Sequence, residues 1–527
     1  MYRQTLSVGL LASTLLVSAL TVATAATYVR GNDGDPETLD QHKTSTVVEA
    51  NILRDLYEGL VIYDTSAQIM PGVATSWDIS EDGLVYTFTL RDDAKWSNGD
   101  PVTANDFVYS LNRIMDPATG AKYANILYPV KGAEAINKGE DATLGVDAID
   151  DKTLAITLER PTPYFIELLT HQTGLPVHAP SVEAHGTRFV DPANMVSNGA
   201  YTLSSFRPND KIVLIKNPEF HDAANVAIET VEYTPFEDRA TCARRFEAGE
   251  VHSCSDIAAE QIGDLMARLG DQVRVAPYLG VYYYGINSAR DPFGDPRVRQ
   301  ALSMAIDREF LAEEIFSGTM LPAYSWVPPG IGNYVETPPK LDYADLPMLD
   351  REDAAIALME EAGFGPDNPL TIEISYNTSE NHKNAATAIA SMWEPLGVQV
   401  DYNVRDASAH YAMLRDEKVH DVARAGWIGD YSDPQNFLFL NRADNPGFNY
   451  GNYNNPAHDA LLDKAAETAD LVERAKILAE AEAIFLEDMP QIPLLYYSSR
   501  SLVSPKLQGW EDNIQNVHPT RFMSVAD

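Results

Sequence analysis

The chain has 527 residues, of which 39 are basic and 77 acidic, so its formal net charge is −38. Such a charge repels nucleic acids and anionic membranes and makes both poor partners. The hydrophobic fraction of 45% is ordinary for a globular protein, but a chain this long exceeds what one hydrophobic core serves. We therefore expect two or more lobes.

The first 26 residues show the three-part pattern of a secretory signal peptide. Arg3 supplies the positive charge, residues 6–22 are apolar or small, and residues 23–26 are small. The apolar part is too short, and too interrupted by Ser and Thr, for a good membrane span. No cysteine lies near the cleavage site to carry a lipid anchor. We expect a cleaved and unanchored protein, which would be periplasmic in a Gram-negative bacterium.

The first regular elements that the sequence predicts are a strand at 84–90 and a helix at 103–115. The segment LVYTFTL alternates, is rich in β-branched and aromatic residues, and follows an Asp-Gly turn signal. Thr103 and Asp106 have the spacing of a capping box, and apolar residues at helical spacing follow them.

The only two cysteines, Cys242 and Cys254, lie in a predicted helix at 241–249 and a predicted strand at 251–256. An even count in an exported protein favours a disulfide, which would contribute about 3 kcal/mol in a loop this short. Two free buried thiols are the alternative. We expect no metal site, because His252 has no second ligand close in the sequence.

The later part of the chain predicts helices that alternate with strands. The expected helices lie at 350–362 and 382–393 with two more in 455–487, and the expected strands at 372–376 and 398–404. Asp350 is expected to cap the first of these helices, and Gly363 to end it. The alternation indicates βαβ units, and therefore an α/β fold.

The segment DVARAGWIGDYSDP at 421–434 places Arg424 and Asp430 six residues apart in apolar surroundings. Burying either charge without an opposite partner would cost several kcal/mol. A dipolar ligand would satisfy both, with an ammonium for Asp430 and a carboxylate for Arg424. That description fits a peptide or an amino acid. The alternative is that both charges pair with protein groups across a domain interface.

Common catalytic and nucleotide-binding signatures are missing from the sequence. It contains no HExxH zinc motif, no GxSxG elbow, no P-loop and no GxGxxG fingerprint. This favours a binding protein over an enzyme, and we expect no cofactor.

The stretch WSNGDPVTANDFVYSLNRIMDP at 96–117, with SWDISEDGLVYTFTLR before it, resembles the signature of the family 5 extracellular solute-binding proteins. ILRDLYEGL at 52–60 and YYYGINSARDPFGDPRVRQALSMAIDRE at 282–309 agree with this resemblance. The likeness is greatest to the oligopeptide-binding receptors of ABC importers, because ARAGWIGDYSDP looks like their ligand-proximal strand and loop. The resemblance implies a monomer that binds short peptides and delivers them to the permease subunits of an ABC transporter.

The resemblance also implies the architecture. We expect a two-lobed α/β periplasmic-binding-protein fold (type II, similar to cluster C) with an additional third domain and the ligand enclosed between the lobes. Lobe I would combine residues 27–57, 182–279 and 497–527. Domain II would be 58–181, and lobe III would be 280–496.

The resemblance carries binding roles to particular residues. Asp430 would receive the α-ammonium of the peptide, and Arg424 would serve its carboxylate end. The peptide backbone would pair with a strand on each side, with residues 45–47 along one side and 426–428 along the other. The further candidates are Ser45, Thr46, Val47, Tyr123, Tyr283, His382, Gly426, Trp427 and Ile428.

These candidates have different expected roles. Gly426 would leave room for backbone approach, and Trp427 would either wall a side-chain pocket or be an ordinary buried indole. Tyr283 is expected to face the ligand, while Tyr282 and Tyr284 belong to the core. His382 would lie near the ligand carboxylate, or alternatively be an exposed residue at a helix start.

Three departures from the enteric oligopeptide binders limit the likeness. Gly280 and Ile428 occupy the positions of their disulfide. Ser408 replaces a tryptophan, and Ser45 replaces an acidic neighbour of the arginine. One pocket is therefore reshaped. The alternatives to a peptide receptor are a receptor for another solute, such as a cell-wall peptide, an opine or a metal chelate, and a secreted hydrolase.

Overall fold

The computed structural model describes residues 26–526 apart from 45, 237, 259, 260, 406 and 446. The predicted signal peptide therefore lies almost wholly outside the described residues. No helix in the described ranges has both the length and the apolar character to cross a membrane.

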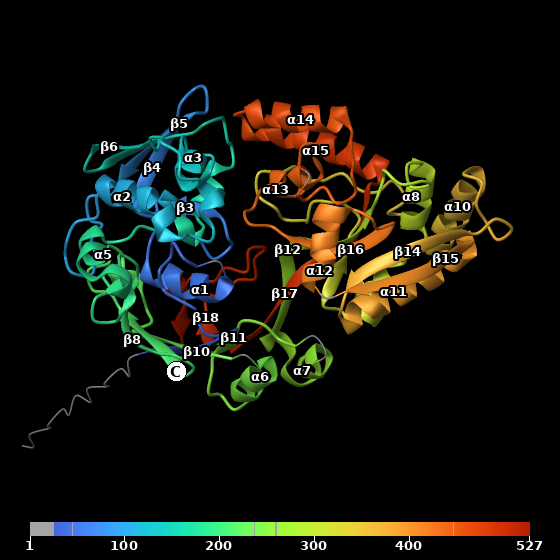
Figure 1. Cartoon of the computed structure of the whole chain (residues 1–527). Helices are drawn as coiled ribbons and strands as arrows, with labels where there is room; N and C mark the ends of the chain where they lie inside the picture. Colours follow the sequence, from blue (N-terminus) through green and yellow to red (C-terminus); the bar gives the residue numbers. More distant parts are fainter. Residues whose placement is uncertain are drawn as a thin grey trace, which may run out of the picture.

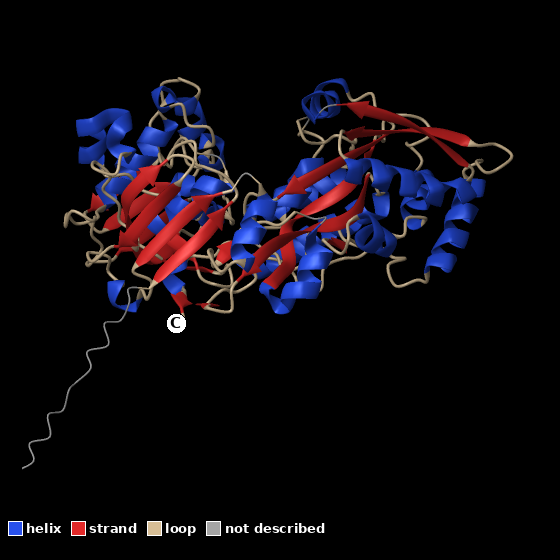
Figure 2. Cartoon of the chain, turned by 90° about the horizontal axis from the view of Figure 1, so that it is seen from below, coloured by secondary structure: helices blue, strands red, loops and turns tan. Residues whose placement is uncertain are grey.

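A large mixed sheet runs through both halves of the molecule (Figures 1 and 2). Its strands, in spatial order, are β15 (Val398–Arg405), β14 (Leu370–Asn377), β16 (Val422–Ile428), β12 (Val273–Ile286), β17 (Gln491–Val503), β11 (Ser253–Cys254), β1 (Thr27–Asn32), β10 (Thr230–Pro235), β9 (Lys211–Lys216) and β8 (Tyr201–Arg207). A short strand, β13 (Met320–Pro322), also pairs with β17.

The strands β12 and β17 connect the two halves. Residues 273–277 of β12 pair with the end of β17, and residues 281–285 pair with its beginning. The register shifts between Pro277 and Val281, so the ladder is broken where the strands pass from one half to the other. In Figure 1 both strands lie between the blue-green half and the yellow-orange half.

The buried apolar residues group in the same two halves. One core draws all its buried members from 279 to 496. A second core combines residues of the ranges predicted for lobe I and for domain II, so these two ranges pack as one body. A smaller core lies under α6 (Arg239–Glu247) and α7 (Ile262–Leu269). We keep the names lobe I, domain II and lobe III for the predicted ranges, whose limits stay a prediction.

Domain II has its own antiparallel sheet, in the order β4 (Ala74–Ile79), β5 (Val85–Leu90), β7 (Thr153–Thr157) and β6 (Val146–Asp150). The predicted strand at 84–90 is confirmed as β5. The predicted helix is confirmed as α2 (Ala104–Met115), and Asp106 accepts the backbone N–H of Thr103 at 2.7 Å to close the capping box. The helix α4 (Phe165–Leu168) lies near the end of this domain.

Lobe III is built from the predicted βαβ arrangement. The helix α11 (Glu380–Trp393) connects the parallel neighbours β14 and β15, as the sequence indicates. The helices α10 (Met348–Glu361), α14 (Pro456–Glu467) and α15 (Leu471–Asp488) also form where they are predicted. The predicted cap of α10 is wrong, because the helix begins earlier and Asp350 lies in its first turn. An acidic residue is favourable there as well, near the positive end of the helix dipole.

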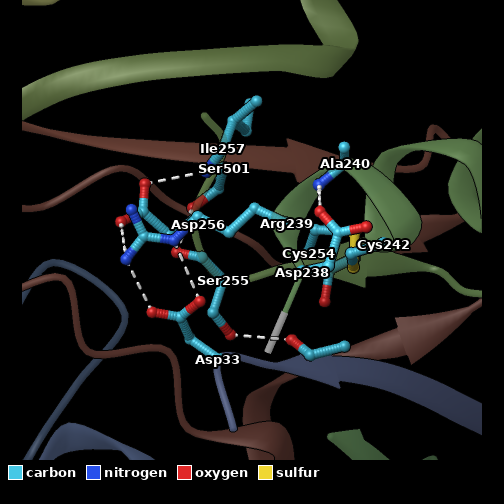
Figure 3. The surroundings of a disulfide bond; sticks show 12 residues. Asp33, Asp238, Arg239, Ala240, Cys242, Cys254, Ser255, Asp256, Ile257 and Ser501 are labelled. Atoms are coloured by element: carbon cyan, nitrogen blue, oxygen red, sulfur yellow. Dashed lines mark hydrogen bonds and ion pairs between the residues drawn. A yellow bond between two sulfur atoms is a disulfide. The ribbon is translucent and has the colours of Figure 1, made fainter. Parts of the chain in front are cut away.

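Cys242 and Cys254 form a disulfide that joins α6 to β11 (Figure 3). The helix begins at Arg239, and the strand is shorter than predicted. A Cβ on Gly31 would lie 2.4 Å from the sulfur of Cys242, so only glycine fits on the neighbouring strand β1. Arg239 pairs with Asp256 at 3.0 Å and so fixes the same corner of lobe I. The disulfide closes a local loop within lobe I, where Cys254 pairs with Leu502 near the end of the crossing strand β17.

Candidate functional site

The strand β16 carries the predicted binding segment and pairs with β12 in antiparallel register. Tyr284 lies opposite Arg424, and Tyr282 opposite Gly426. Because side chains alternate along a strand, these four residues share one face of the sheet. Trp427 is on the other face.

Arg424 is buried, with 8% of its surface exposed, and every partner of its guanidinium is neutral. Nη1 donates to Asn377 Oδ1 and to the Tyr411 hydroxyl, and Nη2 donates to the Tyr497 hydroxyl, each at 3.0 Å. The guanidinium carbon lies 4.7 Å from the centre of the Tyr282 ring. Its buried Nε has no hydrogen-bond partner. Among the described residues, no carboxylate forms an ion pair with Arg424.

Asp430 follows β16 and is exposed between the two bodies of the molecule. Its Oδ1 accepts a hydrogen bond from the Tyr123 hydroxyl of domain II at 2.7 Å. Loss of hydration raises the pKa of Asp430, and the bond from Tyr123 opposes that rise. No cation of the described chain pairs with this carboxylate. Both charges of the segment therefore lack a protein partner of opposite sign in the part of the chain that the structure describes.

Tyr123 holds its position by stacking on His171, with ring centres 5.1 Å apart. It begins a short 3-10 turn in domain II, whereas Asp430 belongs to lobe III. Their hydrogen bond therefore joins the two bodies across the site.

The tyrosines of β12 are oriented differently from the prediction. Tyr282 contacts Arg424 and places its hydroxyl 3.2 Å from His382 Nδ1. Tyr283 is 2% exposed and packs edge-on against Trp326 in the core of lobe III. The pairing register decides this, because Arg424 lies opposite Tyr284 and shares its face with Tyr282. The prediction that Tyr283 faces the ligand is therefore wrong, because its side chain lies in the core of lobe III.

His382 lies in the first turn of α11 and is partly buried. Burial first, and then the charge of Arg424, lower its pKa to about 3. The imidazole is therefore neutral at physiological pH. It therefore adds a neutral hydrogen-bonding group close to the guanidinium of Arg424.

Gly426 leaves room for another side chain of the protein. A Cβ at this position would lie 2.5 Å from the hydroxyl of Tyr497, which fills the space above the strand. The glycine thus admits the tyrosine that binds Arg424. Ile428, opposite Gly280, is 39% exposed at the end of β16.

Trp427 is half-buried on the opposite face of β16. Its Nε1 donates to Asn436 Oδ1 at 2.8 Å, and its ring packs edge-on against Phe439 and Phe448. Phe448 is 36% exposed. The indole is therefore held in place while part of the aromatic group remains accessible.

The segment predicted to lie on the other side of the ligand is the start of a helix. Thr46 is the N-cap of α1 (Val47–Leu56), and its backbone N–H donates to Glu49 at 3.1 Å. Val47 is therefore helical and 53% exposed, and the prediction that it belongs to a pairing strand is wrong. Thr46 has extended backbone angles. Ser45 lies outside the described residues.

The sequence analysis missed four residues that bind Arg424: Asn377, Tyr411, Tyr497 and Tyr282. They come from four separate segments, so spacing along the chain contains no signal for them. Only Tyr282 could have been found, from its alternation with Tyr283. No group of His, Cys, Asp and Glu in the described ranges could hold a metal ion.

The chain forms two bodies joined by crossing strands, and the β16 segment carries two charges without a partner of opposite sign in the described residues. These are features of a solute-binding protein of the bilobed type. The chain belongs to the bacterial extracellular solute-binding proteins, family 5, whose model matches residues 68–449. It is 38% identical to the periplasmic oligopeptide-binding protein OppA of Salmonella typhimurium, over 97% of both chains.

Two solved structures show how the lobes are arranged. The unliganded open form of the murein tripeptide-binding protein MppA has a TM-score of 0.90 at 35% identity, over 95% of this chain and 98% of that one. The OppA of Haemophilus influenzae in complex with the peptide RPPGFSPFR has a TM-score of 0.71 at 34% identity, over 95% and 99%. Identity and coverage are nearly equal, so the higher score places the present arrangement of lobes nearer to the open form.

Proposed function

We propose that this protein is the substrate-binding component of an ABC importer and binds short peptides between lobe I and lobe III. The observation that carries the proposal is the pair of charges Arg424 and Asp430, on β16 and just after it, which have no partner of opposite sign in the described chain. A zwitterionic peptide supplies the opposite charge to each, with its ammonium at Asp430 and its carboxylate at Arg424.

The chemistry of the cleft suits ligands that differ in side chains. Peptides share only their backbone amides and two terminal charges, so a receptor that reads these groups accepts many sequences. A charge-assisted hydrogen bond is about twice as strong as a neutral one, which makes a terminal charge an effective anchor. The free Nε of Arg424 and the neutral His382 are available to a carboxylate.

Ligand binding would stabilise a closed arrangement. In the open arrangement Asp430 accepts a hydrogen bond from Tyr123 of domain II. A peptide that touches both bodies adds contacts that only the closed state completes, and so shifts the equilibrium toward closure. The broken register of β12 and β17 is where this hinge motion would occur.

The remaining features of the proposal follow from the class of protein. The chain would be exported through the signal peptide at 1–26, act in the periplasm as an unanchored monomer, and dock on permease subunits in the membrane. It would have no catalytic activity of its own.

Calorimetric titration with tri- to pentapeptides tests the proposal. We expect saturable binding of several unrelated sequences, and an increase in thermal stability with each. Mass spectrometry after incubation with a peptide pool distinguishes a receptor from a hydrolase, because a receptor returns its ligand intact. Absence of binding to any peptide in the pool, or the appearance of cleaved masses, would contradict the proposal.

A further inference from the structure

A cavity that neither Arg424 nor Asp430 lines is bounded in part by Ser432, two residues after Asp430. It has a volume of about 640 Å³. Its walls come from domain II at 66–86 and 161–167, from the crossing region at 276–277 and 512–514, and from lobe III at 329–333, 432 and 469–471. Tyr431 lies between Asp430 and the lining residue Ser432 in the sequence. Its ring stacks on that of Tyr164, with ring centres 5.0 Å apart.

Much of the lining of this cavity is apolar or aromatic, from Ile69, Trp77, Ile79, Tyr86, Ile166 and Leu471, and neutral polar residues such as Gln68 and Asn333 complete it. No lysine, arginine or histidine of the described chain lines it, whereas two carboxylates do, Glu167 and Asp512. Asp512 is already paired, because its Oδ2 lies 3.5 Å from Arg274 Nε and its Oδ1 accepts from Trp510 Nε1 at 3.2 Å. Glu167 is the carboxylate without a cation.

Glu167 lies on α4 and is 8% exposed. Its Oε2 accepts a hydrogen bond from the Tyr63 hydroxyl at 3.3 Å, and its Oε1 accepts none from the described residues. Burial first, and then the nearby charge of Asp433, raise its pKa to about 8. Asp433 is itself neutralised by Arg474, with contacts of 2.7 and 2.8 Å.

We propose that this cavity binds a small organic cation with an apolar body, of the alkylammonium or arylammonium class, whose charged head lies against Glu167. Oε1 supplies a counter-charge that has no partner among the described residues, and the ammonium relieves the cost of a buried carboxylate. Trp77 and Tyr86 line the cavity with aromatic rings, which attract cations, and Ile79 adds apolar surface for the body of the ligand. The volume lies within the range of about 300–1,000 Å³ of ordinary small-molecule sites.

Titration calorimetry with three probes of similar size tests the proposal: benzyltrimethylammonium, its uncharged carbon isostere neopentylbenzene, and the anion phenylacetate. The titrations are made at about pH 9, above the pKa of Glu167, so that the carboxylate is ionised. We expect the cation to bind and the other two to bind at least about tenfold more weakly.

Two variants and a control locate the binding. Glu167→Gln keeps the shape of the side chain and should weaken binding of the cation at least about tenfold. Ile79→Lys places a positive charge at a wall position that is 48% exposed, and should abolish cation binding while peptide binding persists. Glu140→Gln removes an exposed charge outside the cavity in the same domain and should change nothing.

Three outcomes would overturn the proposal. The first is equal affinity of the cation for the wild type and Glu167→Gln. The second is binding of neopentylbenzene or phenylacetate as tight as that of the cation. The third is no cation binding at millimolar concentrations. Each is read from the cation titration alone, so a failure here is distinct from a failure of peptide binding.

Discussion

Asp430→Asn removes the charge of the predicted ammonium site with little other change. Asparagine keeps the shape of the side chain, and its Oδ1 can still accept the hydrogen bond from Tyr123. The residue is exposed and has no ion pair within the described chain. We therefore expect the free energy of unfolding to change by less than about 1 kcal/mol.

The expected loss of peptide affinity follows from the charge. A hydrogen bond with a charged partner contributes about 1.5–3 kcal/mol, compared with about 0.5–1.5 kcal/mol between neutral groups. Asparagine retains the neutral bond but loses the Coulomb attraction in a cleft that already strips Asp430 of part of its hydration. The difference between the two bonds, about 1–1.5 kcal/mol, corresponds to about 5- to 13-fold weaker binding.

Calorimetric titration with trialanine and N-acetyl-trialanine measures this loss as a double-mutant cycle. The acetylated peptide lacks the ammonium, so it should bind the wild type weakly and should not distinguish Asp430→Asn from it. Asp401→Asn, which removes an exposed charge on β15 in the same lobe, is the matched control. If both peptides bind the wild type equally, Asp430 does not receive the ammonium, and the reasoning fails.

Three further predictions concern stability. Gly426→Ala should displace the Tyr497 hydroxyl, lower the free energy of unfolding by about 1–3 kcal/mol in urea titrations, and weaken peptide binding. Replacing Cys242 and Cys254 by serine should cost about 3 kcal/mol in the same titrations and make the protein insensitive to reductant. The raised pKa of about 8 lets Glu167 bind more protons in the folded state than in the unfolded one. Its contribution to the free energy of unfolding should therefore fall as pH rises from about 5 to 8, by at most about 1.4 kcal/mol per pH unit. Glu167→Gln should remove that contribution, measured as the difference from wild type at each pH.

Each of these three stability predictions has an outcome that would contradict it. Gly263→Ala, a helical glycine with open space around its Cβ, is the control for Gly426→Ala, and equal unfolding curves for the two would refute the close contact with Tyr497. A wild type unaffected by reductant would exclude a stabilising disulfide. If the difference in the free energy of unfolding between the wild type and Glu167→Gln stays constant between about pH 5 and 8, burial does not raise the pKa of Glu167.

The sequence by itself determined the elements whose cause is local. The capping box of Thr103 and Asp106 starts α2, and the alternation of 84–90 forms β5. The helix α11 between two β-branched runs closes a parallel βαβ unit. These depend on neighbours within a few residues, so periodicity and turn chemistry are enough to predict them. The two isolated charges, Arg424 and Asp430, were visible for the same reason.

Only the tertiary structure decided what surrounds those charges. The pairing register of β12 and β16, and not the order of three consecutive tyrosines, places Tyr282 beside Arg424. The hydroxyl of Tyr497, far along the chain, fills the space above Gly426. That Arg424 and Asp430 have no opposite charge in the described chain depends on long-range contacts, which no pattern of spacing records. The physical reason is that packing in three dimensions determines which groups lie next to a buried charge. The sequence therefore indicated two charges that need partners, and the fold showed that the described chain does not supply them.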